Sequence, residues 1–162
     1  MKFTPTADLC EAHKQDSSGA FRALPMLCKS YGAKSAFAGT VSTVKCFEDN
    51  SVVKAAVEEA GLGRVIVVEG GASLRCALVG GNIAASAAKN GWAGLVVNGA
   101  VRDVAELRAC DIGLLALGSH PMASVRRDAG QRDLPVSVQG VLIWPGEWLV
   151  ADDDGVVVMP RG

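Results

Sequence analysis

The sequence predicts a layered α/β sandwich with a mixed sheet, parallel in the middle of the chain and antiparallel at its end. Between residues 39 and 117, strand-like apolar runs alternate with helix-like stretches, which is the pattern of a parallel sheet. After residue 135, β-branched runs are separated by Pro-Gly and Asp-Gly turns, as in antiparallel hairpins. The composition is 49% hydrophobic but only 5% aromatic, which favours sheets covered by small-residue helices. At 162 residues the chain suits one domain, 1–162, and is too short for a TIM barrel.

The first predicted elements are a short helix, a strand and a second helix. Residues 6–13 predict the short helix, with Thr6 as N-cap and Asp8 near the positive end of the helix dipole. Residues 39–46 (GTVSTVKC) alternate in polarity and are rich in β-branched residues, which predicts a strand. The polar cluster 48–50 then starts a helix that ends at Gly61. Its apolar stripe comprises Val52, Val53, Ala56, Val57 and Ala60.

Residues 64–69 (RVIVVE) form a continuous β-branched run, which predicts a strand buried on both faces. The strand leads into a Gly70-Gly71 turn that would allow a ligand to approach the backbone. The sequence GGASLR nevertheless matches neither a Walker loop nor the dinucleotide-binding fingerprint. Glu69 at the strand end is either a carboxylate that supports a site or a solvated cap. Residues 73–79 are expected to form a helical turn.

The stretch 80–103 predicts a loop, a helix, a strand and a charged turn in succession. Gly80 and Gly81 open a helix at Asn82, where free amide N–H groups can hold a carboxylate or a phosphate. The strand 94–98 follows and delivers a charged pair just past its C-terminal end, where open α/β sheets usually bind ligands. A cation, an anion and a row of amide donors are therefore expected to meet in one cleft.

That charged pair is Arg102 and Asp103. Its structural alternative is a salt bridge that merely fixes the strand end, and Glu106, one helical turn on, is most simply part of such a bridge. Spacing alone leaves the two interpretations open.

The rest of the chain predicts a short helix at Val104–Ala109, an apolar strand at 112–117 and an antiparallel finish. His120, in a loop beside a proline, either faces the cleft or is structural. The mixed-sign loop 126–133 is expected to be a solvated surface. The antiparallel strands are predicted at 136–143, 148–151 and 156–159. The aspartates at 152–154 lack the spacing of a calcium loop and predict a hairpin turn.

Several classes of function are disfavoured by composition. Lysine and arginine number 16 against 17 acidic residues, so there is no basic footprint for direct nucleic-acid binding. The five cysteines include no CxxC pair, which argues against a zinc site and a disulfide framework. No run approaches the roughly 20 apolar residues of a membrane helix, and the N-terminus lacks a signal-peptide core. We therefore expect a cytoplasmic protein that does not bind a membrane.

The chain resembles the family named for the regulator of ribonuclease activity A, which also contains class II 4-hydroxy-4-methyl-2-oxoglutarate aldolases. The resemblance covers nearly the whole chain, through segments such as KCFEDN, RVIVVEGGASLRCALVG, NGWAGLVVNGAVRDVAELRACDIGLLALG and QGVLIWPGEWLVADDDGVVV. It implies a ββα sandwich like the phosphohistidine swivelling domains, assembled as a homotrimer with clefts between subunits.

The aldolase members carry an aspartate, twenty intervening residues, and then an arginine and an aspartate. By position, the resemblance implies that Asp103 binds a divalent metal and that Arg102 binds a substrate oxygen. The pyruvoyl carboxylate would lie on the backbone of Gly80, Gly81, Asn82 and Ile83. This sequence departs from the motif because the first aspartate is replaced by Gly81.

The implied function is a metal-dependent lyase acting on a small 2-oxo acid, as a 4-hydroxy-4-methyl-2-oxoglutarate aldolase or an oxaloacetate decarboxylase. Both reactions pass through a pyruvate enolate, which Mg²⁺ or Mn²⁺ stabilises as a Lewis acid. The alternative is a non-catalytic regulator that binds and inhibits a ribonuclease. A phosphohistidine carrier is a third hypothesis, with His120 as its only candidate.

Overall fold

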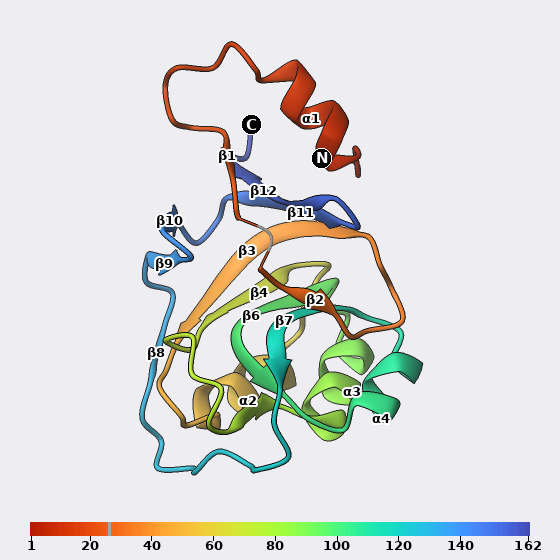
Figure 1. Ribbon diagram of the computed structural model, residues 1–162, viewed down its shortest axis with the longest axis vertical. Helices are drawn as coiled ribbons and strands as arrows, with labels where there is room; N and C mark the ends of the chain where they lie inside the picture. The colour runs from red at the N-terminus through yellow and green to blue at the C-terminus, as the bar shows by residue number, and fades with distance from the viewer. Residues whose placement is uncertain (26) are drawn as a thin grey trace.

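The computed structural model describes residues 1–25 and 27–162, and ten strands within that range form one mixed sheet (Figure 1). The helices are α1 (Thr6–Ala12), α2 (Ser51–Glu58), α3 (Gly81–Lys89) and α4 (Val104–Ala109). The strands are β1 (Arg22–Ala23), β2 (Lys29–Ser30), β3 (Phe37–Lys45), β4 (Val65–Glu69), β5 (Ala77–Val79), β6 (Gly94–Val101), β7 (Gly113–Ser119), β8 (Gln131–Arg132), β9 (Val136–Val138), β10 (Val141–Ile143), β11 (Trp148–Asp152) and β12 (Gly155–Met159).

The centre of the sheet is parallel, as predicted. Strand β3 pairs with β4, β4 with β6, and β6 with β7, all in parallel. Strand β4 is buried on both faces because its side chains alternate between two apolar cores. Val65 and Val67 belong to one core, whereas Ile66 and Val68 belong to the other. The continuous apolar run of this strand is thereby explained.

The molecule has the predicted layered ββα architecture. Helices α2, α3 and α4 cover one face of the parallel strands (Figure 1). The antiparallel hairpin β11–β12 joins the sheet at β3, and together with the separate β9–β10 ribbon it encloses the second core on the opposite face. Helix α1 lies outside this hairpin, where Leu9 and Cys10 pack against Val150 and Val157. None of the helices in the described residues combines the length and the apolar character needed to cross a bilayer.

The helical turn predicted at residues 73–79 is wrong. Its second half is strand β5, which pairs in parallel with the end of β6, Ala77 opposite Ala100. The reason is tertiary: β6 runs to Val101, three residues beyond the predicted strand 94–98, whereas β4 pairs with it only as far as Asn98. Strand β5 therefore takes the place that β4 leaves free.

Two other local predictions differ from the structure. Helix α1 begins at Thr6 itself and its N-cap is Pro5. The Thr6 hydroxyl donates to Asp152 Oδ1 at 2.6 Å, which fastens the helix to the β11–β12 hairpin. The strand predicted at 136–143 is two strands, because Gln139 and Gly140 adopt positive φ angles of 51° and 80° and turn the chain back. Residues 152–155 form the predicted hairpin turn.

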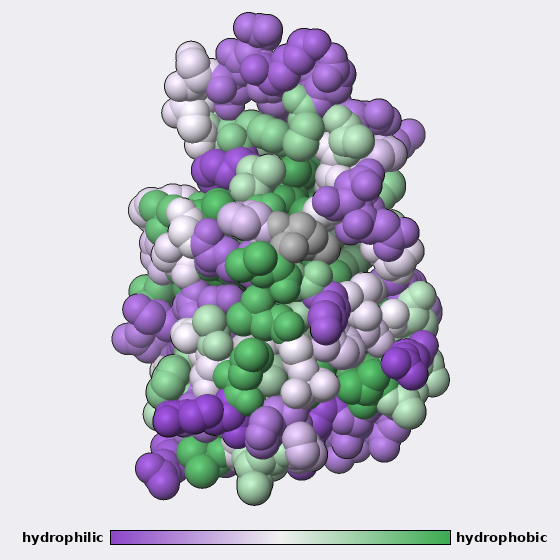
Figure 2. All heavy atoms as spheres, viewed as in Figure 1, coloured by the Kyte–Doolittle hydropathy of each residue, from purple (hydrophilic) through white to green (hydrophobic). Residues whose placement is uncertain are grey.

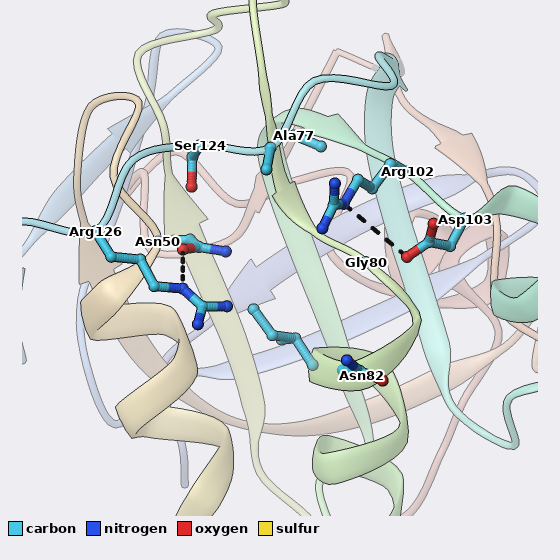
Figure 3. A pocket seen from close by; sticks show the side chains of 10 residues that line it. Asn50, Ala77, Gly80, Asn82, Arg102, Asp103, Ser124 and Arg126 are labelled. Carbon is cyan, nitrogen blue, oxygen red and sulfur yellow. Dashed lines mark hydrogen bonds and ion pairs between the residues drawn. The ribbon is translucent and has the colours of Figure 1, made fainter.

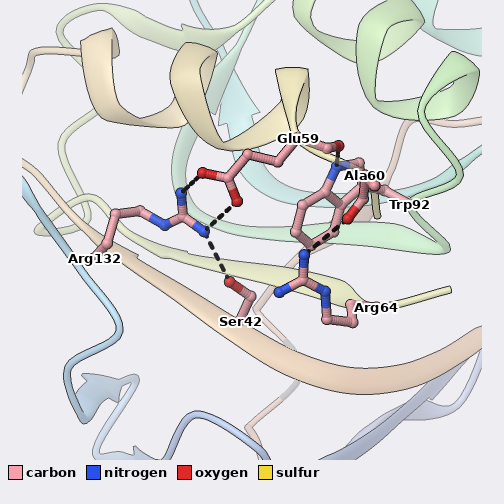
Figure 4. A network of polar contacts seen from close by, with 6 residues as sticks. All are labelled: Ser42, Glu59, Ala60, Arg64, Trp92 and Arg132. Carbon is pink, nitrogen blue, oxygen red and sulfur yellow. Dashed lines mark hydrogen bonds and ion pairs between the residues drawn. The ribbon is translucent and has the colours of Figure 1, made fainter. Parts of the chain in front are cut away.

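A polar network anchors the end of α2, which stops at Glu58 before the predicted Gly61 (Figure 4). Arg132 pairs with the Glu59 carboxylate at 3.0 Å and also donates to Ser42. The indole of Trp92 donates to the Glu59 carbonyl at 3.1 Å, and the guanidinium of Arg64 stacks 4.5 Å from the ring centre. The end of the loop predicted as a solvated surface is therefore fixed to the sheet through β8.

Candidate functional site

A polar cavity of about 310 Å³ opens at the C-terminal ends of β5 and β6 (Figure 3). Its walls come from the start of α2, the start of α3, the turn after β6 and the loop 123–126. The lining residues are Asn50, Ala77, Gly80, Asn82, Ile83, Arg102, Asp103, Ala123, Ser124 and Arg126. The predicted residues Gly80, Asn82, Ile83, Arg102 and Asp103 thus meet in one cavity, whereas Gly81 is buried behind its wall.

Arg102 and Asp103 form the whole turn between β6 and α4. Asp103 adopts the left-handed conformation, with φ 58° and ψ 44°, which aspartate tolerates better than most residues. The Arg102 Nε lies 4.0 Å from Asp103 Oδ2, and the two side chains are 42% and 39% exposed. A pair this long and this exposed contributes little stability. Both charged groups therefore remain accessible to a ligand.

The glycines before α3 allow Asp103 to approach the helix start. The Gly81 N–H donates to Asp103 Oδ2 at 2.9 Å. A β-carbon on Gly80 would lie 2.7 Å from the same oxygen, so a larger residue would push the carboxylate away. The Gly81 N–H is therefore already occupied by this hydrogen bond. The free amide donors are those of Asn82 and Ile83, because these residues lie in the first turn of α3 and have no helical carbonyl four residues earlier to bond.

Glu106 is the functional candidate that the sequence interpretation missed. A β-carbon on Gly81 would lie 1.9 Å from Glu106 Oε2. The Glu106 carboxylate therefore fills the space into which the aspartate of the family motif would project. Within the described residues Glu106 takes part in no ion pair, and the bridge expected there joins Arg102 to Asp103 instead. The signal was the helical spacing, since a residue three positions after Asp103 lies on the same helix face.

Two other residues left open by the sequence can now be placed. His120 lines a smaller cavity beside Arg102 and Asp103, and its Nδ1 accepts a hydrogen bond from the Met122 N–H at 3.1 Å. Glu69 does not line the candidate site. Its carboxylate holds the Gly71 N–H and the amide of Asn98, which matches the cap interpretation.

The donor atoms suit a hydrated divalent ion. The described residues contain no group of three acidic, histidine or cysteine side chains that would enclose a metal. Asp103 and Glu106 instead present two carboxylates beside the same glycine pair. Magnesium is commonly bound in proteins through one or two carboxylates while keeping several waters, so the residues present fit such an ion.

The opposite wall of the cavity is held by Asp49. Its Oδ1 accepts from the Ser51 amide and hydroxyl at 2.9 and 2.6 Å, and its Oδ2 accepts from the Arg127 N–H at 2.7 Å. Burial acts to raise the pKa of Asp49, but these hydrogen bonds outweigh it and lower the pKa to about 2. Next to it, Asn50 Oδ1 accepts from Arg126 Nε at 3.2 Å (Figure 3). The sequence interpretation missed both residues, because Asn50 matches a plain helix start and Arg126 is one charge among several in a mixed-sign loop.

Fold and site together define a class: mixed-sheet α/β proteins with an arginine, an aspartate and free helix amides in a cleft at the parallel strand ends. Within that class, the chain belongs to the RraA-like family (Aldolase/RraA), whose model matches residues 6–158.

Three relatives illustrate the family. A Burkholderia multivorans protein with the provisional name 4-hydroxy-4-methyl-2-oxoglutarate aldolase is 58% identical over 154 residues, 94% of each chain. A structure from Thermus thermophilis, described as the RNA-processing inhibitor RraA, is 46% identical with a TM-score of 0.92 and covers 99% of this chain and 94% of its own. A Geobacillus kaustophilus structure, described as an S-adenosylmethionine:2-dimethylmenaquinone methyltransferase, is 38% identical with a TM-score of 0.93 and covers 98% and 96%. Because these descriptions differ on one fold, the activity must be argued from the site.

Proposed function

We propose that this protein is a divalent-metal-dependent lyase that cleaves the C–C bond next to a pyruvoyl group, acting on 4-hydroxy-4-methyl-2-oxoglutarate and oxaloacetate. The observation that carries the proposal is the convergence of Arg102, the carboxylate of Asp103 and the amides of α3 around one cavity, with the carboxylate of Glu106 beside Gly81. The provisional name of the Burkholderia multivorans relative supports the same activity.

Substrate binding follows from the charges of the site. The amides of Asn82 and Ile83, at the positive end of α3, bind the pyruvoyl carboxylate. Arg102 carries a permanent positive charge and donates to the 2-oxo oxygen, where negative charge develops as the bond breaks. Asp103 would hold Mg²⁺ or Mn²⁺. When bound, the ion supplies Lewis-acid stabilisation of the pyruvate enolate.

Glu106 provides the proton acceptor that position 81 lacks. In aldol cleavage, its carboxylate takes the proton of the 4-hydroxyl group as the C3–C4 bond breaks. The C4 fragment leaves as pyruvate, and the remaining enolate takes a proton from water at C3 to become the second pyruvate, while Glu106 returns its proton to water. In oxaloacetate the same bond breaks with release of CO₂, so no hydroxyl proton has to be removed. In this mechanism, the carboxylate that the family motif supplies at position 81 is supplied instead by Glu106.

The test is pyruvate release from both substrates with Mg²⁺, with Mn²⁺, with chelator and in Asp103→Ala. The assays are run under reducing conditions, since we expect a cytoplasmic protein and its five cysteines are unpaired. We expect metal-dependent rates well above a metal-only blank, abolished by the chelator and by the variant. Rates equal to the blank for both substrates would refute the lyase.

We also infer a homotrimer. Figure 2 shows apolar side chains exposed across the middle of one face, while the end that carries α1 is strongly polar. Exposed large apolar residues of the chain include Phe47, Met122 and Trp144. Large exposed apolar patches mark interfaces. Light scattering on the purified protein should give a mass of three chains. A monomer at micromolar concentration would contradict the inference.

The competing function is inhibition of a ribonuclease without catalysis. It is favoured by the Thermus thermophilis relative, which is described as an RNA-processing inhibitor. A ribonuclease of the E type is then the expected partner. Inhibition of RNA cleavage by the wild type and equally by Asp103→Ala, with no pyruvate release by either, would establish this function in place of the lyase.

A further inference from the structure

Arg126 places a second positive charge in the cavity, across from Arg102 (Figure 3). We propose that Arg126 binds the carboxylate of the substrate that lies beyond the cleaved bond, and so selects 2-oxo acids with a second carboxylate on the departing fragment. This proposal rests on the proposed lyase function and names the substrate class of the same site.

The guanidinium of Arg126 is aimed by a buried amide. Its Nε donates to Asn50 Oδ1 at 3.2 Å, and Asn50, only 8% exposed, is itself fixed because its Nδ2 donates to the Leu78 carbonyl at 3.1 Å. No carboxylate in the described part of the chain forms an ion pair with Arg126. The terminal nitrogens are thus left to bind a planar anion, for which a guanidinium is suited.

The loop that carries Arg126 is held in place before any ligand binds. Asp49 accepts from the backbone of Arg127 at 2.7 Å, and the Ser51 hydroxyl accepts from the Asp128 N–H at 3.1 Å. In the same wall, the hydroxyl oxygen of Ser124 is buried and has no hydrogen-bond partner among the described residues. A carboxylate oxygen bound by Arg126 would give this hydroxyl an acceptor, which a buried polar group requires.

The two substrates should respond differently to this subsite. In 4-hydroxy-4-methyl-2-oxoglutarate, the second carboxylate sits on C4 and leaves unchanged in the departing pyruvate, so an arginine can hold it throughout. In oxaloacetate, the second carboxylate is itself the group that becomes CO₂. An arginine bound to it stabilises the charged ground state and gives no help in the transition state. Arg126 therefore favours aldol cleavage over decarboxylation.

The variants for the test are Arg126→Ala and Arg126→Lys. The control is Arg127→Ala, which removes the positive charge of the neighbouring residue, whose side chain does not line the cavity. Arg126→Ala should lower kcat/KM for aldol cleavage by about 10- to 100-fold, mainly through KM, as expected for loss of a charged hydrogen bond. Decarboxylation should be unchanged or faster, Arg126→Lys should retain part of the aldol activity, and Arg127→Ala should match the wild type. An equal loss for both substrates, or no loss for the aldol substrate, would overturn the proposal.

Binding separates this proposal from the lyase itself. Calorimetry in the presence of Mn²⁺ compares 2-oxoglutarate, which has the second carboxylate but no hydroxyl to deprotonate, with 2-oxobutyrate, which has neither. Arg126→Ala should weaken 2-oxoglutarate by about 10- to 100-fold and leave 2-oxobutyrate unchanged. The same binding result, together with no turnover by the wild type, would refute the lyase function and support the carboxylate-binding role of Arg126. Equal affinities for 2-oxoglutarate in the wild type and in Arg126→Ala would refute the role of Arg126, whether or not the protein turns over substrate.

Discussion

Moving the carboxylate from position 106 to position 81 tests whether Glu106 replaces the missing aspartate of the family motif. The perturbation has two parts. Glu106→Ala removes the proton acceptor, and Gly81→Asp in the same chain returns a carboxylate from the opposite backbone segment. The exchange is feasible because a β-carbon on Gly81 points into the space of Glu106 Oε2, 1.9 Å away, and that space is vacated in the double variant.

The expected magnitudes follow from this geometry. A positioned general base contributes about 10²- to 10⁴-fold, so Glu106→Ala should lower kcat for aldol cleavage by that factor. Gly81→Asp alone sets two carboxylates side by side. At about 4 Å their repulsion is roughly 4 kcal/mol at an effective dielectric constant near 20 and about 1 kcal/mol in water, and the exposure of Glu106 favours the lower figure. The single Gly81→Asp variant should therefore unfold at a lower temperature than the double variant.

The assay is pyruvate release from 4-hydroxy-4-methyl-2-oxoglutarate, with thermal unfolding measured in parallel. We expect the double variant to recover at least about tenfold of the activity lost in Glu106→Ala, because a carboxylate within reach of the hydroxyl restores general-base catalysis. Gly81→Ala combined with Glu106→Ala is the matched control, since it adds the β-carbon without the charge. Glu106→Ala with an unchanged kcat would refute the role of Glu106. A folded double variant no more active than the control would refute the shared position.

Three further predictions concern the metal, acid stability and packing. Asp103→Asn keeps a residue that tolerates φ 58° but loses the negative charge. The affinity for Mn²⁺, measured by calorimetry, should fall by at least about tenfold with little change in Tm. An unchanged affinity would exclude Asp103 as a metal ligand. Burial acts to raise the pKa of Asp49, but the hydrogen bonds from Ser51 and the loop outweigh it and lower the pKa from 3.8 to about 2. The ionised Asp49 carboxylate therefore stabilises the folded state by about 2 kcal/mol above pH about 4, and this contribution is lost as the pH falls towards 2. Asp49→Asn should flatten this part of an acid-unfolding curve followed by circular dichroism, and an unaltered curve would contradict the assignment. Trp92→Phe leaves the Glu59 carbonyl without its hydrogen-bond donor and should lower the free energy of unfolding, measured in urea, by about 1–3 kcal/mol. Trp92→Ala should lower it by about 3–5 kcal/mol. Wild-type stability in both variants would show that the network in Figure 4 contributes nothing to stability.

The sequence by itself determined the parallel centre of the sheet and half of the site. A continuous apolar run such as residues 64–69 can be stable only between two layers, and its pattern is visible without any knowledge of its neighbours. The same is true of a glycine pair that opens a helix and of the charges at Arg102 and Asp103 just beyond a strand. These features depend on residues close together in the chain, where spacing alone sets which side chains share a face.

Only the tertiary structure decided the rest. Strand β5 exists because β6 extends past β4, which no local pattern encodes. Glu106 reaches the space beside Gly81 because α4 packs against α3. Arg126 enters the cavity because Asp49, 78 residues from Arg127, holds the loop in place. Each of these arrangements joins segments that are distant in sequence, and their geometry is fixed by the packing of elements whose relative positions the sequence pattern does not contain.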